Sequence, residues 1–546
     1  MKVTRRDFLK KNALVSTSAA LAPLAADARN QPDTAGSQRS TTNARASTRK
    51  DWSDTRKNDL NIVLVIIDTL RYDCLCGEHS DRIKTPHMDR LARRSRVFHR
   101  AYSNSYPTIP MRTDVMTGQY GVPFNPWKPL DFDVTTLPRV LGKAGYCTQL
   151  IHDTPHLVNG GHAFDWPFHA WTPVRGAEVD RPWIDDKGFS YLENWKPDSI
   201  FDFLCKPEMP GARSHTMFTY TRANRDRSAP EDWNTADLFL TASRFLQDNS
   251  RRDNFFLWID SFDPHEPWDA PPEYVRMYDD TPGFDGKLDP RAFWGGNRHK
   301  DFKNKPKCQR RIKAQYAAKV THLDHWFGEF MDTLEATGLD ENTAVILTAD
   351  HGTVWGENGE FGKRGGRGYC EPEGHVPFTV YVPGMDAGSS NAIVQPQDVF
   401  STVLGIAGIR EPEEADGFDV ISQKDTPREV GLMGARGDAR HWQRNKNAHI
   451  FTVFDEDWVL RFATNPDACS LFRTGDAEHD VAKENPKVVK QLWKAGIDEM
   501  RRRGLPSPLI DWLNSGGQKP FPSDCADWVD RPANWRPYWA RTYNRW

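Results

Sequence analysis

One stretch of the sequence restricts the fold more than any other. Residues 61–67 read NIVLVII, a continuous apolar run, largely β-branched, after its first residue. A strand with one face in water alternates apolar and polar residues, so an unbroken run is typical of a strand buried on both faces of a parallel sheet. Similar runs recur at residues 148–151, 254–259, 343–348 and 376–382.

Helical patterns lie between these runs. Thr85-Pro86 predicts a helix start, with Thr85 as the N-cap and proline in the first turn. Residues 309–337 predict the longest helix, because apolar side chains recur there every three or four positions until Gly338. Strands that alternate with helices predict an α/β fold in which helices cover both faces of the sheet.

The N-terminal residues have the composition of an export signal. Residues 4–10 read TRRDFLK, a twin-arginine pattern, and a short apolar stretch then leads to an A-x-A cleavage site at 26–28. We expect a signal peptide over 1–28, recognition by the twin-arginine export machinery, and a periplasmic or extracellular location. Residues 29–58 are polar and predict a disordered linker. No later apolar run reaches the ~18 residues that a stable membrane span needs.

The remaining chain divides into two regions. Residues 59–385 contain the strand runs and predict the main domain, with a Trp-rich, aperiodic insertion at about 160–310 of the kind that shapes a substrate cleft. Residues 386–546 predict a small α+β subdomain and a tail. Its expected elements are helices near 396–407 and 485–503 and strands at 448–453 and 458–463.

Charge and cysteine spacing exclude two kinds of partner. A formal net charge of -3 argues against nucleic acid, which would require a strongly basic face. Cys74 and Cys76 are separated by one residue and no second C-x-x-C follows, so the spacing of a zinc site is absent. An exported protein can form disulfides, but the sequence does not determine which cysteines pair.

Three polar residues directly follow two of the expected strands. Asp68 follows the first strand, and Asp350-His351 follows the strand at 343–348. Because ligands bind at the carboxyl ends of strands in α/β sheets, these side chains are expected to meet there. Two carboxylates and an imidazole are suitable ligands for a divalent metal.

A second candidate feature lies at Thr108-Ile-Pro-Met-Arg112. Pro110 fits the first turn of a helix, which places Thr108 beside free backbone amides and puts Arg112 one turn further on. A hydroxyl, a helix N-terminus and a guanidinium together suit an anionic tetrahedral ester such as a sulfate or phosphate. The pattern alone is a weak signal, since helix capping also explains it.

Over about residues 60–505 the sequence resembles the sulfatase family of the alkaline phosphatase superfamily. The resemblance implies a large, mixed, mostly parallel sheet flanked by helices, alkaline phosphatase-like, and makes 59–385 a sulfatase-like catalytic domain. The motifs that carry it, in the order and spacing of the family, are VLVIIDTLR (63–71), TPHMDRLA (85–92), Thr108 through Arg112 to Thr117-Gly118, TADHG (348–352), Gly362-Lys363 and VPFTVYVPG (376–384).

The resemblance also implies a metal centre. It assigns Asp68, Asp350 and His351 as ligands of one divalent ion, with the nucleophile position, Thr108, as a further ligand. Calcium or magnesium is expected, and zinc or manganese remain open.

The same resemblance implies roles for three basic side chains. Arg112 is expected to hold the nucleophile and the anion. Lys363 matches the lysine that contacts the leaving ester oxygen or the sulfate. His265, within DPHEP at 263–267, matches a histidine that faces the same pocket.

The chain departs from the family at the nucleophile. Sulfatases have Cys, or sometimes Ser, where this chain has Thr108, and convert it to formylglycine; oxidised threonine would give a ketone instead. Threonine nucleophiles do occur elsewhere in the superfamily, where a metal activates the hydroxyl and a covalent phospho-threonine forms. Those enzymes usually hold two zinc ions, and the candidate ligands for a second ion here are Asp263, His265 and His375.

Two further departures affect the surroundings. Typical sulfatases have Gly-Lys-x-His after the third strand, whereas this chain has His152-Asp-Thr-Pro-His156, which leaves His156 as a candidate general acid. Many members have paired aspartates where this chain has Asp68-Thr69. The loss of one carboxylate lowers the negative charge of the metal site, which weakens the case for tight calcium binding.

The expected function is metal-dependent hydrolysis of a sulfate ester, or of a phosphodiester, on a carbohydrate or another small organic molecule. A phosphate monoester carries about two negative charges and would require more positive charge at the site. Two alternatives remain: a threonine-nucleophile phosphodiesterase or phosphotransferase, and an inactive relic that binds sulfated or phosphorylated glycans.

Overall fold

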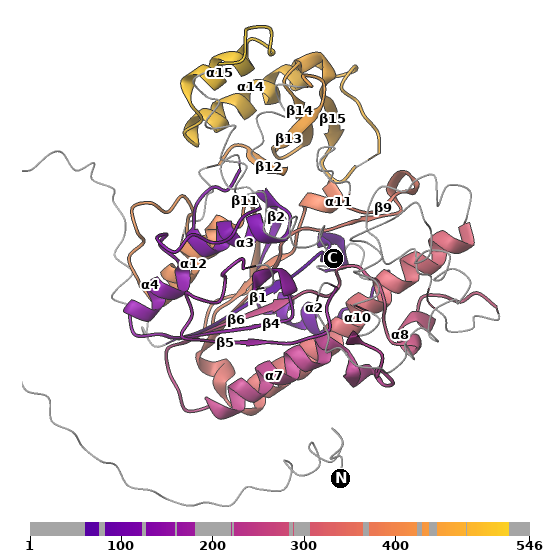
Figure 1. The fold of residues 1–546 in the computed structure, drawn as a ribbon, viewed down its shortest axis with the longest axis vertical. Coiled ribbons are helices and arrows are strands. Elements are labelled where there is room, and N and C mark those ends of the chain that lie inside the picture. The colour runs from indigo at the N-terminus through magenta and orange to yellow at the C-terminus, as the bar shows by residue number, and fades with distance from the viewer. Residues whose placement is uncertain are drawn as a thin grey trace, which may run out of the picture. The chain divides into compact units, whose positions relative to one another are not determined.

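An eight-stranded sheet forms the centre of the computed structural model (Figure 1). In chain order its strands are β1 (Asn61–Ile67), β2 (Arg96–Ala101), β4 (Cys147–His152), β5 (Ala170–Pro173), β6 (Phe255–Ser261), β7 (Thr343–Ala349), β10 (Phe378–Tyr381) and β11 (Gly388–Val394). Across the sheet the order is β11-β2-β10-β7-β1-β6-β4-β5. The predicted fold class, an α/β protein with a mostly parallel, mixed sheet, is confirmed.

The structure describes part of the chain. The described residues are 60–75, 82–122, 127–158, 161–178, 180, 220, 223–282, 288, 306–363, 371–422, 428–435, 445–476 and 478–522. The predicted signal peptide (1–28) and linker (29–58), and much of the insertion at 160–310, lie outside them. The described residues belong to one compact unit, Trp52–Trp546. Three of its described cysteines, Cys74, Cys147 and Cys469, are free thiols.

The apolar runs form the middle of the sheet as expected. Every residue of β1, β6 and β7 is buried, which explains why these strands have no polar alternation. Both neighbours of β1, namely β6 and β7, run parallel to it. The run at 376–382 differs, because β10 is antiparallel to both of its neighbours, β7 and β2. An apolar run reports burial on both faces and contains no information on strand direction.

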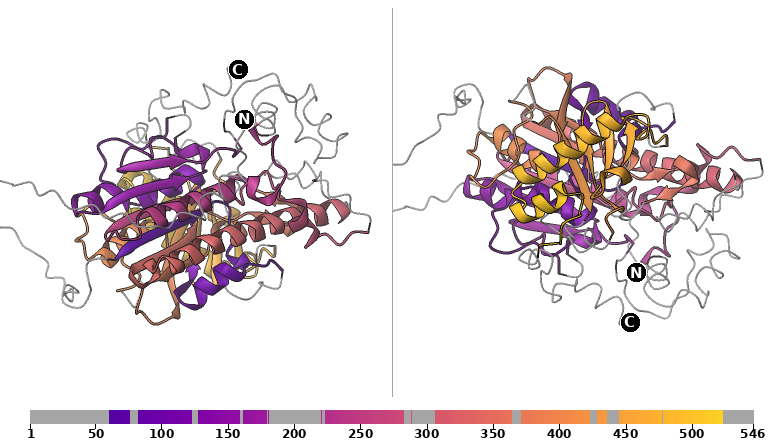
Figure 2. Two further views of the ribbon diagram at one scale, coloured as in Figure 1. Left: turned by 90° about the horizontal axis from the view of Figure 1, so that it is seen from below. Right: turned by 90° about the horizontal axis from the view of Figure 1, so that it is seen from above.

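Two groups of helices cover the sheet (Figure 2). In the left view of Figure 2, α2 (Pro86–Arg93), α7 (Asn234–Asp248) and α10 (Pro306–Ala336) lie together, and α10 contacts both of the others. The second group comprises α3 (Thr108–Thr117), α4 (Leu137–Lys143) and α12 (Gln397–Ala407), with α3 in contact with the other two. In the part of the chain that the structure describes, no helix is both long and apolar enough to cross a membrane.

Thr85 is the N-cap residue of α2, as predicted, but its side chain does not cap the helix. Helix α2 does begin after Thr85, but the Thr85 hydroxyl donates to the Cys74 carbonyl oxygen at 2.9 Å. The carboxylate of Asp324, on α10, accepts instead from the backbone N–H groups of His87 (3.1 Å) and Met88 (2.8 Å). A carboxylate supplied by a neighbouring helix therefore satisfies the free amides of α2, and the negative charge suits the helix N-terminus.

The C-terminal region forms its own sheet and core, as expected for a small α+β subdomain. Its strands, β12 (Gly431–Ala435), β13 (His449–Phe454), β14 (Trp458–Ala463) and β15 (Ser470–Arg473), and its helices, α14 (Pro486–Arg502) and α15 (Ser507–Asn514), enclose a separate apolar cluster. The edge strand of this sheet is β3 (Ser105–Tyr106), which pairs in parallel with β12. Because β3 immediately precedes α3, the second sheet supports the chain where it enters the helix of Thr108.

The remaining short elements are α8 (Pro272–Arg276), α11 (Glu371–Gly374), β8 (Val354–Trp355) and β9 (Phe361–Gly362). Short 3₁₀ turns span Tyr72–Cys74, Pro155–Leu157, Pro230–Asp232, Leu339–Asn342, Glu357–Gly359 and Pro466–Ala468.

Candidate functional site

Three carboxylates meet at the carboxyl edge of the central strands. Asp68 follows β1, Asp350 follows β7, and Asp260 is the sixth residue of β6, opposite Ile66 of β1. All three side chains are fully buried. Parallel neighbours present their carboxyl ends at one edge, so residues far apart in the sequence come together there.

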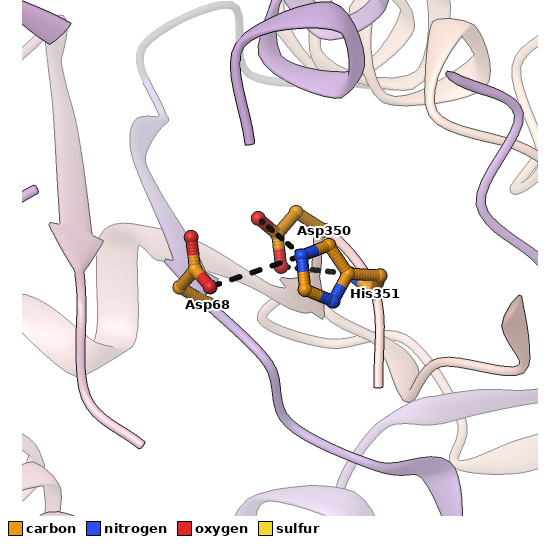
Figure 3. Close-up of side chains that lie close together, drawn as sticks. All are labelled: Asp68, Asp350 and His351. Atoms are coloured by element: carbon orange, nitrogen blue, oxygen red, sulfur yellow. Dashed lines mark hydrogen bonds and ion pairs between the residues drawn. The ribbon is translucent and has the colours of Figure 1, made fainter. Parts of the chain in front are cut away.

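Asp68, Asp350 and His351 form a cluster with the donor atoms of a metal site (Figure 3). One ligand atom from each lies within 4.8 Å of the others. His351 Nε2 is 3.7 Å from Asp350 Oδ2 and 4.0 Å from Asp68 Oδ1. Among the described residues, this is the one group of His, Cys, Asp and Glu side chains arranged in this way.

The hydrogen bonds of this cluster leave a place for a cation. His351 Nδ1 lies 2.7 Å from the Gly352 carbonyl oxygen, so Nδ1 carries the proton and Nε2 presents its lone pair to the carboxylates. Neither His351 Nε2 nor Asp68 Oδ2 has a hydrogen-bond partner, although both are buried. A lone pair that faces carboxylate oxygens without a proton between them is repulsive unless a cation binds, so these residues fit a divalent metal.

Backbone geometry fixes the two carboxylates. Thr69 adopts φ 64°, which is unusual for a residue other than glycine. In this conformation its N–H donates to Asp350 Oδ1 at 3.0 Å and its hydroxyl donates to Asp68 Oδ1 at 2.6 Å. Thr69 therefore holds both carboxylates in place. Burial, followed by the charge of Asp350, raises the pKa of Asp68 well above its ordinary value.

Arg112 connects the three carboxylates. Its Nε and Nη2 each donate to Asp260 at 2.8 Å, and its Nη1 donates to Asp350 Oδ2 at 2.7 Å. Nη1 also lies 3.5 Å from Asp68 Oδ2. Burial lowers the pKa of Arg112, but Asp260 and Asp350 outweigh it and raise this pKa above its ordinary value. The guanidinium is thus a fixed buried charge beside the metal cluster.

Thr108 is the first residue of α3 and is buried. Arg112 Nη1 donates to the Thr108 carbonyl oxygen at 3.0 Å as well as to Asp350, so one nitrogen links the helix start to the carboxylate cluster. Pro110 is the third residue of α3 and lies in its first turn, as the sequence predicted, and Pro107 is at the cap position. The Thr108 amide therefore belongs to the unpaired, positive end of the helix.

Lys363 and His265 lie in a second group of side chains. Lys363 Nζ is 3.4 Å from Glu266 Oε2, and His265 Nδ1 is 3.6 Å from a carboxylate oxygen of Glu266 and of Glu178. Burial lowers the pKa of Lys363, but Glu266 and Asp68 outweigh it and raise this pKa. The influence of Asp68 connects this group to the metal cluster.

His156 lies in the 3₁₀ turn Pro155–Leu157, after β4. Its ring packs edge-on against Trp127 and Phe262, with centroids 5.2 and 5.7 Å away, and Phe262 stacks on His265 at 4.0 Å. Burial, followed by the charges of His162 and Lys363, lowers the pKa of His156 to about 3. His156 is therefore a neutral imidazole near neutral pH, which does not suit the acid that the sequence suggested.

The residues named for a second metal do not come together. Asp263 forms an ion pair with Lys319 at 2.7 Å. His375 forms one with Glu371 at 2.8 Å and stacks on the ring of Tyr72 at 3.7 Å. Each is already engaged in a structural contact.

Sequence reasoning missed several members of the site. Asp260 directly follows the apolar run at 255–259. A charged residue at the end of a buried strand was the available signal. Glu266 lies inside the DPHEP segment, in which the sequence resemblance assigned a role in the pocket to His265 and none to Glu266. Glu178 lies in the aperiodic insertion, and no local pattern marks it.

Comparison with known proteins identifies the family. The family model described as Sulfatase matches residues 60–409. The arylsulfatase of Clostridium perfringens is 26% identical over 486 residues, covering 81% of this chain and 93% of that protein. The endo-4-O-sulfatase of Bacteroides thetaiotaomicron is 27% identical over 365 residues, covering 62% of this chain and 65% of that protein.

Solved structures share the fold. The phosphonate monoester hydrolase of Silicibacter pomeroyi superposes with a TM-score of 0.62 at 22% identity, covering 81% of this chain and 96% of that one. The corresponding enzyme of Agrobacterium radiobacter gives 0.59 at 19% identity, covering 82% and 96%. The chain therefore belongs to the sulfatase family of the alkaline phosphatase superfamily, and it is a sulfuric ester hydrolase-like enzyme.

Proposed function

We propose that this chain is an exported, metal-dependent hydrolase of monoanionic esters, sulfate esters first and phosphodiesters second, carried by a carbohydrate or another small organic molecule. The observation that carries the proposal is a buried pair of atoms that have no hydrogen bond, His351 Nε2 and Asp68 Oδ2, beside Asp350 and the start of α3. Sulfatases generally bind a divalent metal, and this donor set suits one. Calcium or magnesium fits the carboxylate oxygens, whereas zinc or manganese would also accept the imidazole.

A bound cation would lower the pKa of a coordinated hydroxyl and stabilise negative charge on the ester. The protein side chains do the rest. Arg112 fixes the positions of the carboxylates and of the helix start relative to one another. It does so through its hydrogen bonds to Asp260, Asp350 and the Thr108 carbonyl oxygen. Thr108, at the positive end of α3, is placed to attack the ester, and Lys363 to contact an ester oxygen.

The charge of the site favours a monoanion. Its ion pairs join four carboxylates to two cations, and these six side chains are Asp68, Asp260, Glu266, Asp350, Arg112 and Lys363. Two negative charges remain uncompensated, which one divalent cation would balance. A phosphate monoester dianion would then add about two charges without a counter-ion, whereas a sulfate ester or a phosphodiester adds one.

Relatives are consistent with this class. The names of the curated relatives describe sulfatases, and the names of two similar structures describe phosphonate monoester hydrolases, whose substrates are also monoanions. Export follows from the twin-arginine pattern at 4–10, and would place the enzyme in the periplasm or outside the cell.

Steady-state rates on an aryl sulfate, a bis-aryl phosphate and an aryl phosphate test the proposal. We expect turnover of one or both monoanions, with the aryl phosphate slowest. Asp68→Asn should abolish turnover, whereas Asp398→Asn, which alters a buried aspartate paired with Arg428, should retain it in the folded fraction. A clear preference for the aryl phosphate would overturn the charge argument. If the folded, metal-loaded protein is inactive on all three esters, the alternative of an inactive glycan-binding relic is favoured instead. That alternative arises because Thr108 stands where sulfatases have a cysteine.

A further inference from the structure

Two glutamates lie close to one nitrogen of His265, and one of them also contacts Lys363. Glu178 Oε2 and Glu266 Oε2 are each 3.6 Å from His265 Nδ1, and Glu266 Oε2 is also 3.4 Å from Lys363 Nζ. The Glu178 side chain is 12% exposed and that of Glu266 is 8% exposed. Neither glutamate belongs to the metal cluster, and a ligand role does not account for them.

The arrangement of charges decides which glutamate keeps a proton. Lys363 is the cation that pairs with Glu266. Lys319, the other nearby cation, already pairs with Asp263 at 2.7 Å and with Asp269 at 3.5 Å, and its remaining protons go to the carbonyl oxygens of His265 and Pro267. Two carboxylates this close in a buried place do not both ionise readily. Glu178, which has no ion pair with a lysine or arginine among the described contacts, is the neutral member.

The pKa shifts of Glu178 and His265 agree with this geometry. Burial, followed by the charge of Glu266, raises the pKa of Glu178 to about 8, against the lowering effects of Lys363 and Lys319. Burial, followed by the charge of Lys363, lowers the pKa of His265 well below its ordinary value. His265 Nδ1 also donates to the Glu266 carbonyl oxygen at 2.5 Å, so this N–H is already engaged.

The other candidate proton donors of the site are absent, neutral or only weakly acidic, since, against the lowering effect of burial, Glu266 and Asp68 raise the pKa of Lys363. The lysine of the Gly-Lys-x-His motif is missing, and burial keeps both His156 and His265 unprotonated near neutral pH. An alkyl or sugar ester has a poor leaving group, whose oxygen requires a proton as its bond breaks. Glu178 is close enough to Lys363 for the charge of Lys363 to lower its pKa, and the family resemblance assigns Lys363 to the leaving ester oxygen or the sulfate.

We propose that the carboxyl group of Glu178 is the general acid that protonates the leaving oxygen, so that the site acts on esters of alcohols as well as of phenols. The inference rests on the proposed function. A bond forms between Thr108 Oγ and the sulfur or phosphorus of the ester, and the hydroxyl proton passes to solvent. The bond to the leaving oxygen breaks, its electron pair stays on that oxygen, and the Glu178 proton joins it. The Glu178 carboxylate then regains a proton from water. A second water attacks the same sulfur or phosphorus, the bond to Thr108 Oγ breaks with its electron pair on that oxygen, and a proton of this water restores the Thr108 hydroxyl.

A leaving-group series on wild type and Glu178→Gln tests this role. The substrates are the same ester class with a nitrophenol, a phenol and a primary alcohol as leaving groups. We expect Glu178→Gln to keep turnover of the nitrophenyl ester within about threefold and to lose about 100-fold or more on the alkyl ester. Wild-type turnover of the alkyl ester should fall as pH rises through about 8, because the protonated form of Glu178 is required, and this limb should disappear in the variant.

Two controls separate folding from chemistry. Glu371→Gln removes another buried carboxylate, which binds His375 and the Tyr102 hydroxyl, and should leave the leaving-group dependence unchanged. Glu178→Asp should recover part of the alkyl-ester rate.

The outcomes also separate the two proposals. Equal losses on all three esters in Glu178→Gln, with an unchanged pH limb, would overturn the general-acid role while leaving the hydrolase intact. Absence of wild-type turnover on every ester would contradict the proposed function itself.

Discussion

Replacing Asp260 by asparagine tests whether Asp260 balances the charge of Arg112 beside the metal cluster. Asn is nearly isosteric, but it removes the negative charge that accepts from Arg112 Nε and Nη2 at 2.8 Å. Both side chains are fully buried, so the change leaves a buried guanidinium that has lost its bidentate partner. Breaking such a pair typically costs about 3–5 kcal/mol of unfolding free energy.

The functional part of the prediction follows from the remaining contacts. Without Asp260, Arg112 keeps Asp350 at 2.7 Å and Asp68 at 3.5 Å as its carboxylate partners. Its charge would then compete more strongly with a cation for the same oxygens. Loss of a group that orients metal ligands typically weakens metal affinity by about 10- to 100-fold, so the metal concentration for half-maximal activity should rise by that factor.

A matched variant separates the two effects. Asp398 forms a buried bidentate pair with Arg428, with Nη2 2.7 Å from Oδ1, in the helix α12. Asp398→Asn should cost a similar unfolding free energy in urea denaturation without changing the metal requirement. The reasoning is refuted if Asp260→Asn loses less than about 1 kcal/mol, or if both variants shift the metal requirement equally.

Two further predictions concern helix α3. Thr108→Val should reduce turnover by about 1,000-fold or more, because it removes the attacking hydroxyl at nearly constant volume, whereas Thr108→Ser should keep measurable activity. Thr117→Ala, in the same helix, should remain near the wild-type rate, and equal activity of Thr108→Val would exclude the nucleophile role. Burial raises the pKa of Asp114 to about 7, so the folded chain keeps this proton where the unfolded chain has lost it. Its contribution to stability therefore falls as pH rises from about 4 to about 7, and melting temperatures of Asp114→Asn across this window should lack that component; an unchanged pH dependence would contradict this.

Much of the fold was predictable because buried strands have continuous apolar runs and buried helix faces have periodic apolar residues. The runs at 61–67 and 343–348 became β1 and β7, and the periodic segment at 309–337 became α10. Strand direction was not predictable for β10, because an apolar run is the same in a parallel and an antiparallel neighbour. The N-cap residue of α2 was predicted, but the carboxylate that accepts from its free amides was not, because Asp324 is distant in the sequence.

The site residues that directly follow predicted strands could be predicted from the sequence. Asp68, Asp350 and His351 stand directly after buried strands, and the structure brings them together. Asp260 and Glu178 depend on tertiary contacts, the first with Arg112 and the second with His265, and no local spacing encodes those contacts.

Metal removal and reconstitution test the central claim most directly. The purified full chain, exported or expressed in mature form, would be treated with a chelator and then titrated with calcium, magnesium, manganese and zinc, while bound metal and turnover of the aryl sulfate and the bis-aryl phosphate are measured together. Our account predicts that activity is lost with the metal and returns as about one equivalent per chain binds, with no recovery in Asp68→Asn, because Asp68, Asp350 and His351 form one centre. Full turnover by metal-free protein, or two equivalents needed for recovery, would contradict it.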